Sequence, residues 1–325
     1  MKALILVSLL FVIVLVSLSA YLRLAHSGIG CADWPGCYGR IGEPQSVAQP
    51  VSPENAYQRI LAEASQPLAW ATPLHRFVAS VLGLLVVFLV VLALKNRRDR
   101  LISLALLFLT VFLALLGLKS GGLHSPAVVM GNLTGGFMML GLLAWMLFKD
   151  DGGGNPGKAF LPGSFLTVAV LLLVSQILAG GLTSANFAAT SCQTLPDCQG
   201  QWLPGKGVLN AMDLTTDHQV TSAGQVIGGQ ERIDIHIMHR LLAVVTALVL
   251  LLVGWMAWRV EGRLRIAGIM LLLLVLAEFS IGVAAIASDL PIGLAVAHNW
   301  LAGMLLLVLL KIVALNRSMP AGISS

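Results

Sequence analysis

Eight apolar runs, each long enough to cross a lipid bilayer as a helix, constrain the fold of this chain most strongly. The hydrocarbon core of a bilayer is about 30 Å thick and takes about 20 helical residues. Only 11% of the 325 residues are charged and 57% are hydrophobic, which excludes a soluble domain. The alternating pattern of a membrane β-barrel is absent. We therefore predict an all-α integral membrane protein with spans near 3–22, 74–94, 101–118, 127–148, 160–181, 234–257, 264–287 and 292–314.

The basic residues between these runs predict the orientation of the chain. They gather at both termini and in the connections after the second, fourth and sixth runs. Cytoplasmic loops carry an excess of Lys and Arg, so we expect a multi-pass protein of the cell inner membrane with both termini in the cytoplasm. The long connections 23–72 and 182–233 then lie outside. The first run is too long for a signal peptide and is expected to stay as an anchor. No nucleotide-binding fingerprint is present, and the net charge of +5 reflects this asymmetry, so we expect no nucleic-acid partner.

Two cysteine pairs with the same spacing occur in the two long connections. Cys31 and Cys37 lie in "IGCADWPGC", and Cys192 and Cys198 lie in "SCQTLPDC". On the outer, oxidising side of a membrane such pairs persist as disulfides. The spacing leaves open whether they staple their loops or exchange with a thiol–disulfide partner. Zinc binding is disfavoured, because no histidine accompanies either pair at zinc-site spacing.

The cysteine pairs belong to a longer internal repeat. Cys37 is followed 38 residues later by His75, and Cys198 is followed 41 residues later by His239. From His75 it is 56 residues to Gly131, and from His239 it is 59 residues to His298. Each half contains four runs and starts on the same side, which predicts a parallel repeat. We expect two pseudo-symmetric four-helix bundles, residues 1–150 and 151–325.

Histidines inside the predicted spans are the strongest candidates for function, because ionisable residues are costly there. His75, His239 and His298 all lie near the outer ends of their helices. Histidines at one depth in a bundle suit axial ligation of a heme between helices. His239 and His298 form one such pair. His236 could compete with His239, but the repeat favours His239, because Thr72 matches the position of His236.

Arginines follow two of these histidines directly. Arg76 follows His75, and Arg240 follows His239. Each guanidinium could pair with a heme propionate or extend outward to the membrane interface. The sequence does not decide between these two interpretations.

The sequence resembles the heme A synthases of cytochrome c oxidase assembly. The resemblance covers nearly the whole sequence and rests on "SGIGCADWPGCYG", "LHR", "VVMGNLTGGF", "CQTLPDC", "IHIMHR" and "AVAHNWLAG". It implies an oxidoreductase that oxidises the C8 methyl of heme O to a formyl group in two steps. It also implies that heme b is bound between His239 and His298, with Arg240 nearby. The substrate heme O would lie in the first half, at His75, Arg76 and Gly131.

The same resemblance implies further features. His75 would be catalytic, and the two disulfides would be Cys31–Cys37 and Cys192–Cys198. Expected partners are heme O, heme O synthase, an electron donor, membrane lipid and further copies of the chain.

The chain departs from the family pattern at two positions of the first half. Gly131 stands where better-studied members have a histidine, and Thr72 stands where they have a glutamate. His124 could compensate for the first change, and Glu54 or Glu63 for the second. Gly131 could leave one face of heme O open, or it could, with Gly135 and Gly136, only allow tight helix packing.

Three other functions stay open from the residues alone. A diheme cytochrome b electron carrier would need a histidine pair in each half, which Gly131 opposes. A membrane thiol–disulfide relay would contain no heme. A transporter with parallel repeats is weakened by the scarcity of acidic residues inside the spans. Glu278 is the main one, and it either bonds a neighbouring helix or serves proton movement.

Overall fold

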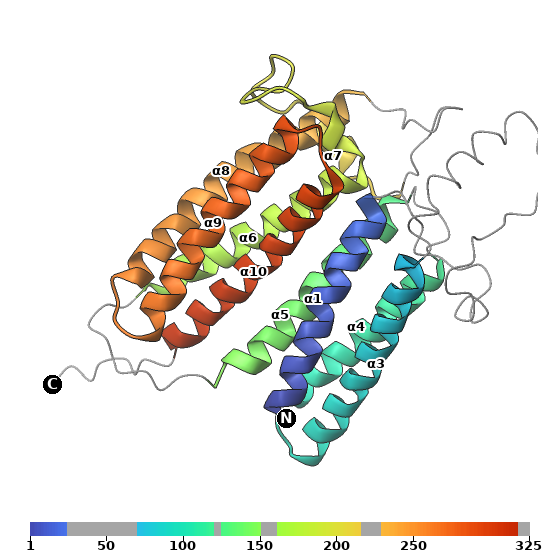
Figure 1. The fold of residues 1–325 in the computed structure, drawn as a ribbon, viewed down its shortest axis with the longest axis vertical. Coiled ribbons are helices and arrows are strands. Elements are labelled where there is room, and N and C mark those ends of the chain that lie inside the picture. Colours follow the sequence, from blue (N-terminus) through green and yellow to red (C-terminus); the bar gives the residue numbers. More distant parts are fainter. Residues whose placement is uncertain (25–69, 120–124, 151–160, 216–228, 318–325) are drawn as a thin grey trace, which may run out of the picture.

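The predicted all-α membrane fold is confirmed. The structure is a computed structural model that describes residues 1–24, 70–119, 125–150, 161–215 and 229–317 (Figure 1). Among these residues, eight helices are long and apolar enough to cross a membrane. They are α1 (Lys2–Leu24), α3 (Ala71–Lys95), α4 (Arg100–Lys119), α5 (Pro126–Phe148), α6 (Gly163–Ala185), α8 (Gln230–Trp258), α9 (Arg263–Ala287) and α10 (Ile292–Arg317).

The helix bounds differ from the predicted spans mainly at polar ends. Helix α8 begins at Gln230, four residues before the predicted span, because Asp234 is buried against the preceding loop. The Asp234 carboxylate accepts hydrogen bonds from the Gly207 amide (2.9 Å) and from Gln230 Nε2 (2.7 Å). Gly207 begins the short helix α7 (Gly207–Ala211), which packs against α8. A polar helix start is therefore stabilised by the outer loop, which hydropathy alone does not detect.

The long helices form two groups of four. Helix α1 packs against α3 and α5, and α4 packs against both α3 and α5. In the second group α8 packs against α6 and α9, and α10 packs against α9 and α6. The groups meet where α10 contacts α1 and α5 and where α6 contacts α5 (Figure 1). The helices of the two groups lie within residues 1–150 and 151–325, and the division into two pseudo-symmetric domains with these bounds stays a prediction.

A continuous apolar core runs through both groups. Buried aliphatic side chains such as Leu89, Leu140, Leu271 and Leu309 belong to one cluster that spans the contact between the groups. Large apolar side chains on the outward faces are exposed, for example Leu101 (84%) and Phe108 (74%). Such a surface is stable only where lipid covers it, since water would disfavour an apolar area of this extent.

Ion pairs tie the connection between α3 and α4 to the end of α5. Arg98 pairs with Asp150, and Lys149 pairs with Asp99, whose side chain is almost fully buried. These residues lie at the helix ends where the sequence predicts the cytoplasm. These contacts hold together one end of the first helix group, and His75 lies toward the other end.

Candidate functional site

Four polar side chains, one from each long helix of the second group, come together inside the bundle. His239 on α8 and His298 on α10 lie at the centre, with ring centroids 6.4 Å apart and ring planes nearly perpendicular at 86°. Gln176 on α6 and Glu278 on α9 lie behind them. The structure thus brings together the two histidines that the repeat singled out, although they are 59 residues apart in the sequence.

Each central histidine ring packs over a glycine of the neighbouring helix. A Cβ atom on Gly180 of α6 would lie 3.1 Å from His239 Cε1. A Cβ atom on Gly282 of α9 would lie 3.1 Å from His298 Cε1. Both distances are shorter than an ordinary carbon–carbon contact of about 3.5–4.0 Å. The two glycines therefore make room for the two imidazole rings.

The inner nitrogens of both rings face polar partners. His239 Nδ1 lies 3.1 Å from Gln176 Nε2, and His298 Nδ1 lies 3.3 Å from Glu278 Oε1. Metal-binding histidines usually use one ring nitrogen for the metal and hydrogen-bond through the other. The Nε2 atoms are therefore the nitrogens that remain to bind a metal.

The geometry fits a metal that brings most of its own ligands. Among the described residues no group of three or more His, Cys, Asp or Glu side chains is placed to hold a bare metal ion. A heme iron needs only two axial ligands from the protein. An atom midway between the two rings would lie half of 6.4 Å from each centroid. This agrees with a metal–imidazole bond of about 2.0 Å plus roughly 1 Å from ring nitrogen to centroid.

His236, the competing histidine, is held elsewhere. Its ring is buried, and its Nδ1 lies 2.9 Å from the backbone oxygen of Ala188. Ala188 begins a short 3₁₀ helix, Ala188–Ser191, at the start of the outer loop. His236 therefore ties α8 to this loop, which favours His239 as the partner of His298.

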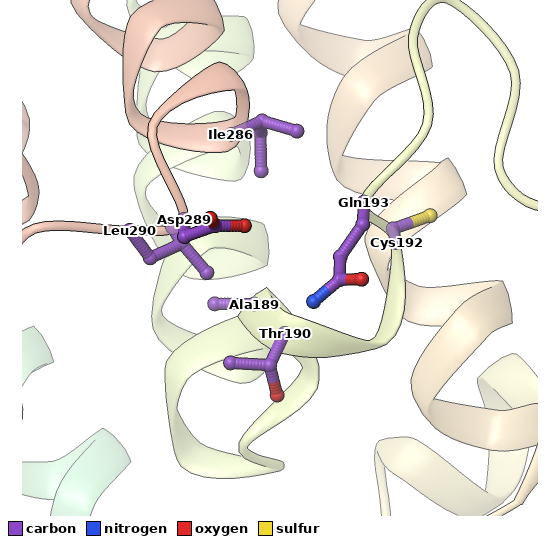
Figure 2. A pocket seen from close by; sticks show the side chains of 7 residues that line it. All are labelled: Ala189, Thr190, Cys192, Gln193, Ile286, Asp289 and Leu290. Carbon is purple, nitrogen blue, oxygen red and sulfur yellow. The ribbon is translucent and has the colours of Figure 1, made fainter.

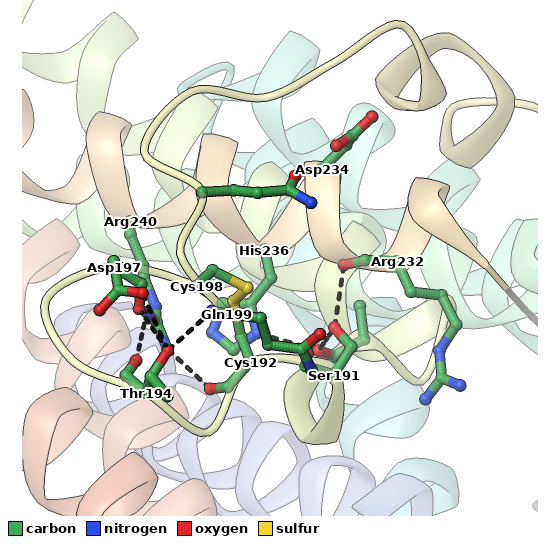
Figure 3. Close-up of a disulfide and its surroundings, with 12 residues drawn as sticks. Ser191, Cys192, Thr194, Asp197, Cys198, Gln199, Arg232, Asp234, His236 and Arg240 are labelled. Atoms are coloured by element: carbon green, nitrogen blue, oxygen red, sulfur yellow. Dashed lines mark hydrogen bonds between the residues drawn. A yellow bond between two sulfur atoms is a disulfide. The ribbon is translucent and has the colours of Figure 1, made fainter.

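The Arg240 guanidinium also holds the outer loop. It donates hydrogen bonds to the backbone oxygens of Cys192 (2.7 Å), Thr194 (2.8 Å) and Asp197 (2.8 Å) (Figure 3). These three bonds fix both sides of the cysteine loop to the residue that follows His239. A contact between Arg240 and a heme propionate stays a prediction.

A disulfide joins Cys192 and Cys198, whose Cα atoms lie 5.0 Å apart (Figure 3). Both cysteines are buried, with exposed fractions of 0% and 1%, and they pack with Ile237 of α8. Exchange with another thiol requires access to a sulfur atom. The burial favours a structural role for this pair. Cys31 and Cys37 lie outside the described residues.

A small pocket with a cavity volume of about 30 Å³ lies between the cysteine loop and the connection from α9 to α10 (Figure 2). The Gln193 side chain points into it, whereas the Cys192 sulfur points away. Its volume is below the 300–1,000 Å³ or so of typical ligand sites. We assign no ligand to it. Its lining residues are Ala189, Thr190, Cys192, Gln193, Ile286, Asp289 and Leu290.

The predicted residues of the first half lie on α3 and α5. His75 is half-buried near the start of α3, and Arg76 beside it is buried. Gly131 on α5 is covered by α4, since a Cβ atom there would lie 2.6 Å from Leu116 Cδ2. This contact supports a packing role for Gly131, and the open-face hypothesis stays a prediction.

Close packing recurs at the neighbouring glycines of α5. A Cβ atom on Gly135 would lie 2.5 Å from Leu113 Cδ2, and one on Gly136 would lie 3.2 Å from Val16 Cγ2. The residues suggested as replacements for the missing family side chains, His124, Glu54 and Glu63, lie outside the described residues.

The chain is similar to known proteins over nearly its whole length. Residues 2–310 match the family described as "Cytochrome oxidase assembly protein". A heme A synthase of Shewanella oneidensis is 32% identical over 320 residues, covering 94% of this chain and 93% of the relative. A heme A synthase of Granulibacter bethesdensis is 25% identical over 341 residues, covering 96% of this chain and 85% of the relative.

Proposed function

The chain belongs to the cytochrome oxidase assembly protein family, and we propose that it acts as a heme A synthase. The enzyme is an oxidoreductase that converts the C8 methyl group of heme O to the formyl group of heme A. An external oxidant oxidises the methyl twice, first to an alcohol and then to a hydrated aldehyde that loses water. Each step adds one oxygen atom to the carbon and removes two electrons from it. The observation that carries the proposal is the His239–His298 pair, with its ring separation of 6.4 Å and a polar partner on each Nδ1.

The second half of the chain binds heme b in this proposal. Heme b, when bound, supplies one-electron transfer to the reaction. His239 and His298 would hold the heme b iron, and two histidine ligands suit a heme that transfers electrons. Gly180 and Gly282 hold the rings at the required spacing. His236 and Arg240 hold the outer loop over the site.

The first half binds the substrate heme O. His75 is the residue that we assign to the substrate iron, and Arg76 lies next to it as a partner for a propionate. Gly131 offers no side chain to the iron, so a heme bound here has one histidine ligand from the pair. A single ligand suits a substrate that has to enter, react and leave.

The outer loops act as lids over the two heme sites. In the second half, Arg240, which follows His239 in the sequence, holds the bridged cysteine loop through three backbone oxygens. The burial of both cysteines supports a staple and argues against a thiol–disulfide relay. By the repeat, we expect Cys31–Cys37 to close the corresponding loop of the first half.

The protein is a multi-pass membrane protein, and the finer topology is part of the proposal. We place it in the cell inner membrane with both termini in the cytoplasm, so both heme sites lie toward the outer surface. It receives heme O from heme O synthase and electrons from a donor. Self-association within the membrane is also expected.

The absorbance spectrum of purified protein tests the heme site. His239→Ala and His298→Ala should each abolish a low-spin bis-histidine heme b spectrum, because each removes one axial ligand. His218→Ala serves as the control and should leave the spectrum intact, because His218 belongs to the long connection 182–233, outside the predicted spans. An unchanged spectrum in either of the first two variants would refute the ligand assignment.

A further inference from the structure

The two central histidines have chemically different partners, although the partners occupy similar places. Glu278 presents a carboxyl group to His298, at 3.3 Å from Nδ1. Gln176 presents an amide to His239, at 3.1 Å from Nδ1. Each partner comes from the helix whose glycine packs under the same ring, α9 for Gly282 and α6 for Gly180. The two sides of the site are thus built alike, apart from the charge.

Both partners have an oxygen that can accept a hydrogen bond from the Nδ1–H group of their histidine. A neutral imidazole that binds iron through Nε2 carries its proton on Nδ1, which then needs an acceptor. Glu278 Oε1 is such an acceptor, and a small rotation of the His298 ring completes the hydrogen bond. The Gln176 Oε1 atom is buried and has no partner among the described residues. A half-turn of the amide presents this oxygen to His239 Nδ1.

Positioning of a ring does not require a carboxyl group. Gln176 shows that an amide has the reach to hold an imidazole in this bundle. A carboxylate inside a membrane span is much more costly than an amide. In the described part of the chain Glu278 Oε2 is buried without a partner, so no second contact offsets this cost. The carboxyl group therefore provides something that an amide does not.

We infer that Glu278 and Gln176 are unequal positioning residues, and that Glu278 lowers the reduction potential of the iron bound by His239 and His298. A carboxylate accepts the Nδ1 proton more strongly than an amide and makes the imidazole a more basic ligand. A more basic ligand favours the ferric state, so the potential falls. Exclusion of water strengthens the effect, because charges act more strongly in a low dielectric. The inference rests on the proposed function.

Exchange of the two side chains tests this inference. Glu278→Gln keeps the shape of the partner and removes its charge, so the midpoint potential of the bound heme should rise. Gln176→Glu adds a second carboxyl group, so the potential should fall. We expect each change to alter the ferric-to-ferrous ratio at a fixed ambient potential by about tenfold, or about 59 mV for one electron. The double variant should return close to the parent potential.

The measurement is a redox titration of each purified protein, followed by its heme absorbance. Glu261→Gln is the matched control, because Glu261 is exposed in the connection from α8 to α9. If the heme of the Glu278→Gln variant has the same midpoint potential as the heme of this control, the inference is overturned. If Glu278→Gln retains no heme, the Gln176→Glu variant tests the inference instead. A midpoint potential of Gln176→Glu that is no lower than the parent's then overturns the inference. Loss of heme from both variants would mean that these residues only retain the cofactor, which also overturns it.

These outcomes are distinct from failure of the proposed function. A parent protein without a bis-histidine heme spectrum would refute the heme site itself. A parent with that spectrum, but with potentials that do not respond to the exchange, would refute only the role of Glu278.

Discussion

The two glycines beneath the histidine rings give the sharpest quantitative prediction. Gly180→Ala and Gly282→Ala each place a Cβ atom 3.1 Å from a histidine Cε1. Carbon atoms prefer a separation of about 3.5–4.0 Å, so each ring has to retreat by about 0.4–0.9 Å. Functional side chains have to be held within about 0.5 Å of their productive geometry. The displacement is therefore large enough to weaken one axial bond.

The same substitutions should not weaken the helices. Alanine in place of glycine inside a helix stabilises it by about 0.5–1 kcal/mol. We therefore expect heme to dissociate about tenfold faster from both variants, while the thermal stability of the heme-free protein stays equal or rises. Valine at either position should have a larger effect, because its two methyl groups extend further over the ring.

Transfer of heme to an excess of a heme-scavenging apoprotein measures the dissociation rate. Gly141→Ala is the matched control, because its Cβ atom would lie 3.8 Å from Leu310 Cδ1, an ordinary contact. If both site variants release heme at the control's rate, the rings are not held by these glycines and the reasoning is wrong.

The outer loop and the first half allow further tests. Replacing Cys192 and Cys198 together by Ser should lower the free energy of unfolding by about 2 kcal/mol, because the bridge closes a loop with a sequence separation of 6. Denaturant unfolding measures this change, and an unchanged midpoint would refute the structural role of the disulfide. Arg240→Gln should weaken the attachment of the same loop by about 1–3 kcal/mol, because three backbone oxygens lose a charged donor. Limited proteolysis between residues 193 and 197 should then become faster. Arg240→Lys should restore part of the protection. Gly131→His should displace Leu116 and, on the open-face hypothesis, give a second low-spin signal with heme O and slow its release. Binding and turnover like the parent's would reject that hypothesis.

The membrane fold was predictable because hydropathy acts over whole helices. A run of about 20 apolar residues has few alternatives to a spanning helix, so all eight spans were found to within a few residues. The early start of α8 was missed, because Asp234 is stabilised by a loop amide that is distant in sequence. Contacts of this kind depend on the path of the loop.

The candidate site was predictable in its ligands and not in its surroundings. His239 and His298 stand out, because the repeat places them at matching positions. Gln176 was missed, although a glutamine in an apolar run is a signal for function. Its partner depends on which helices are neighbours, and one sequence does not reveal this. Gly180 and Gly282 were missed for the same reason, since glycine is common in membrane helices.

The burial of Cys192 and Cys198 distinguishes a structural disulfide from a redox-active pair, and the spacing of the two cysteines does not determine their burial. A staple and a redox pair require the same separation of the two cysteines. The structure places both beneath the loop, against Ile237, where a partner thiol has no access. For Arg240, likewise, the sequence predicts a propionate or the membrane interface as its partner, whereas the structure shows bonds to loop carbonyls.

Conversion of heme O to heme A by this chain is the most direct test of the account. Cells that make heme O but have no other heme A synthase would express the chain, and their extracted pigments would be separated by chromatography. We predict heme A together with some of the alcohol intermediate, and neither product from His75→Ala. If no heme A forms with the parent chain under any electron-donor condition, the proposed function is contradicted.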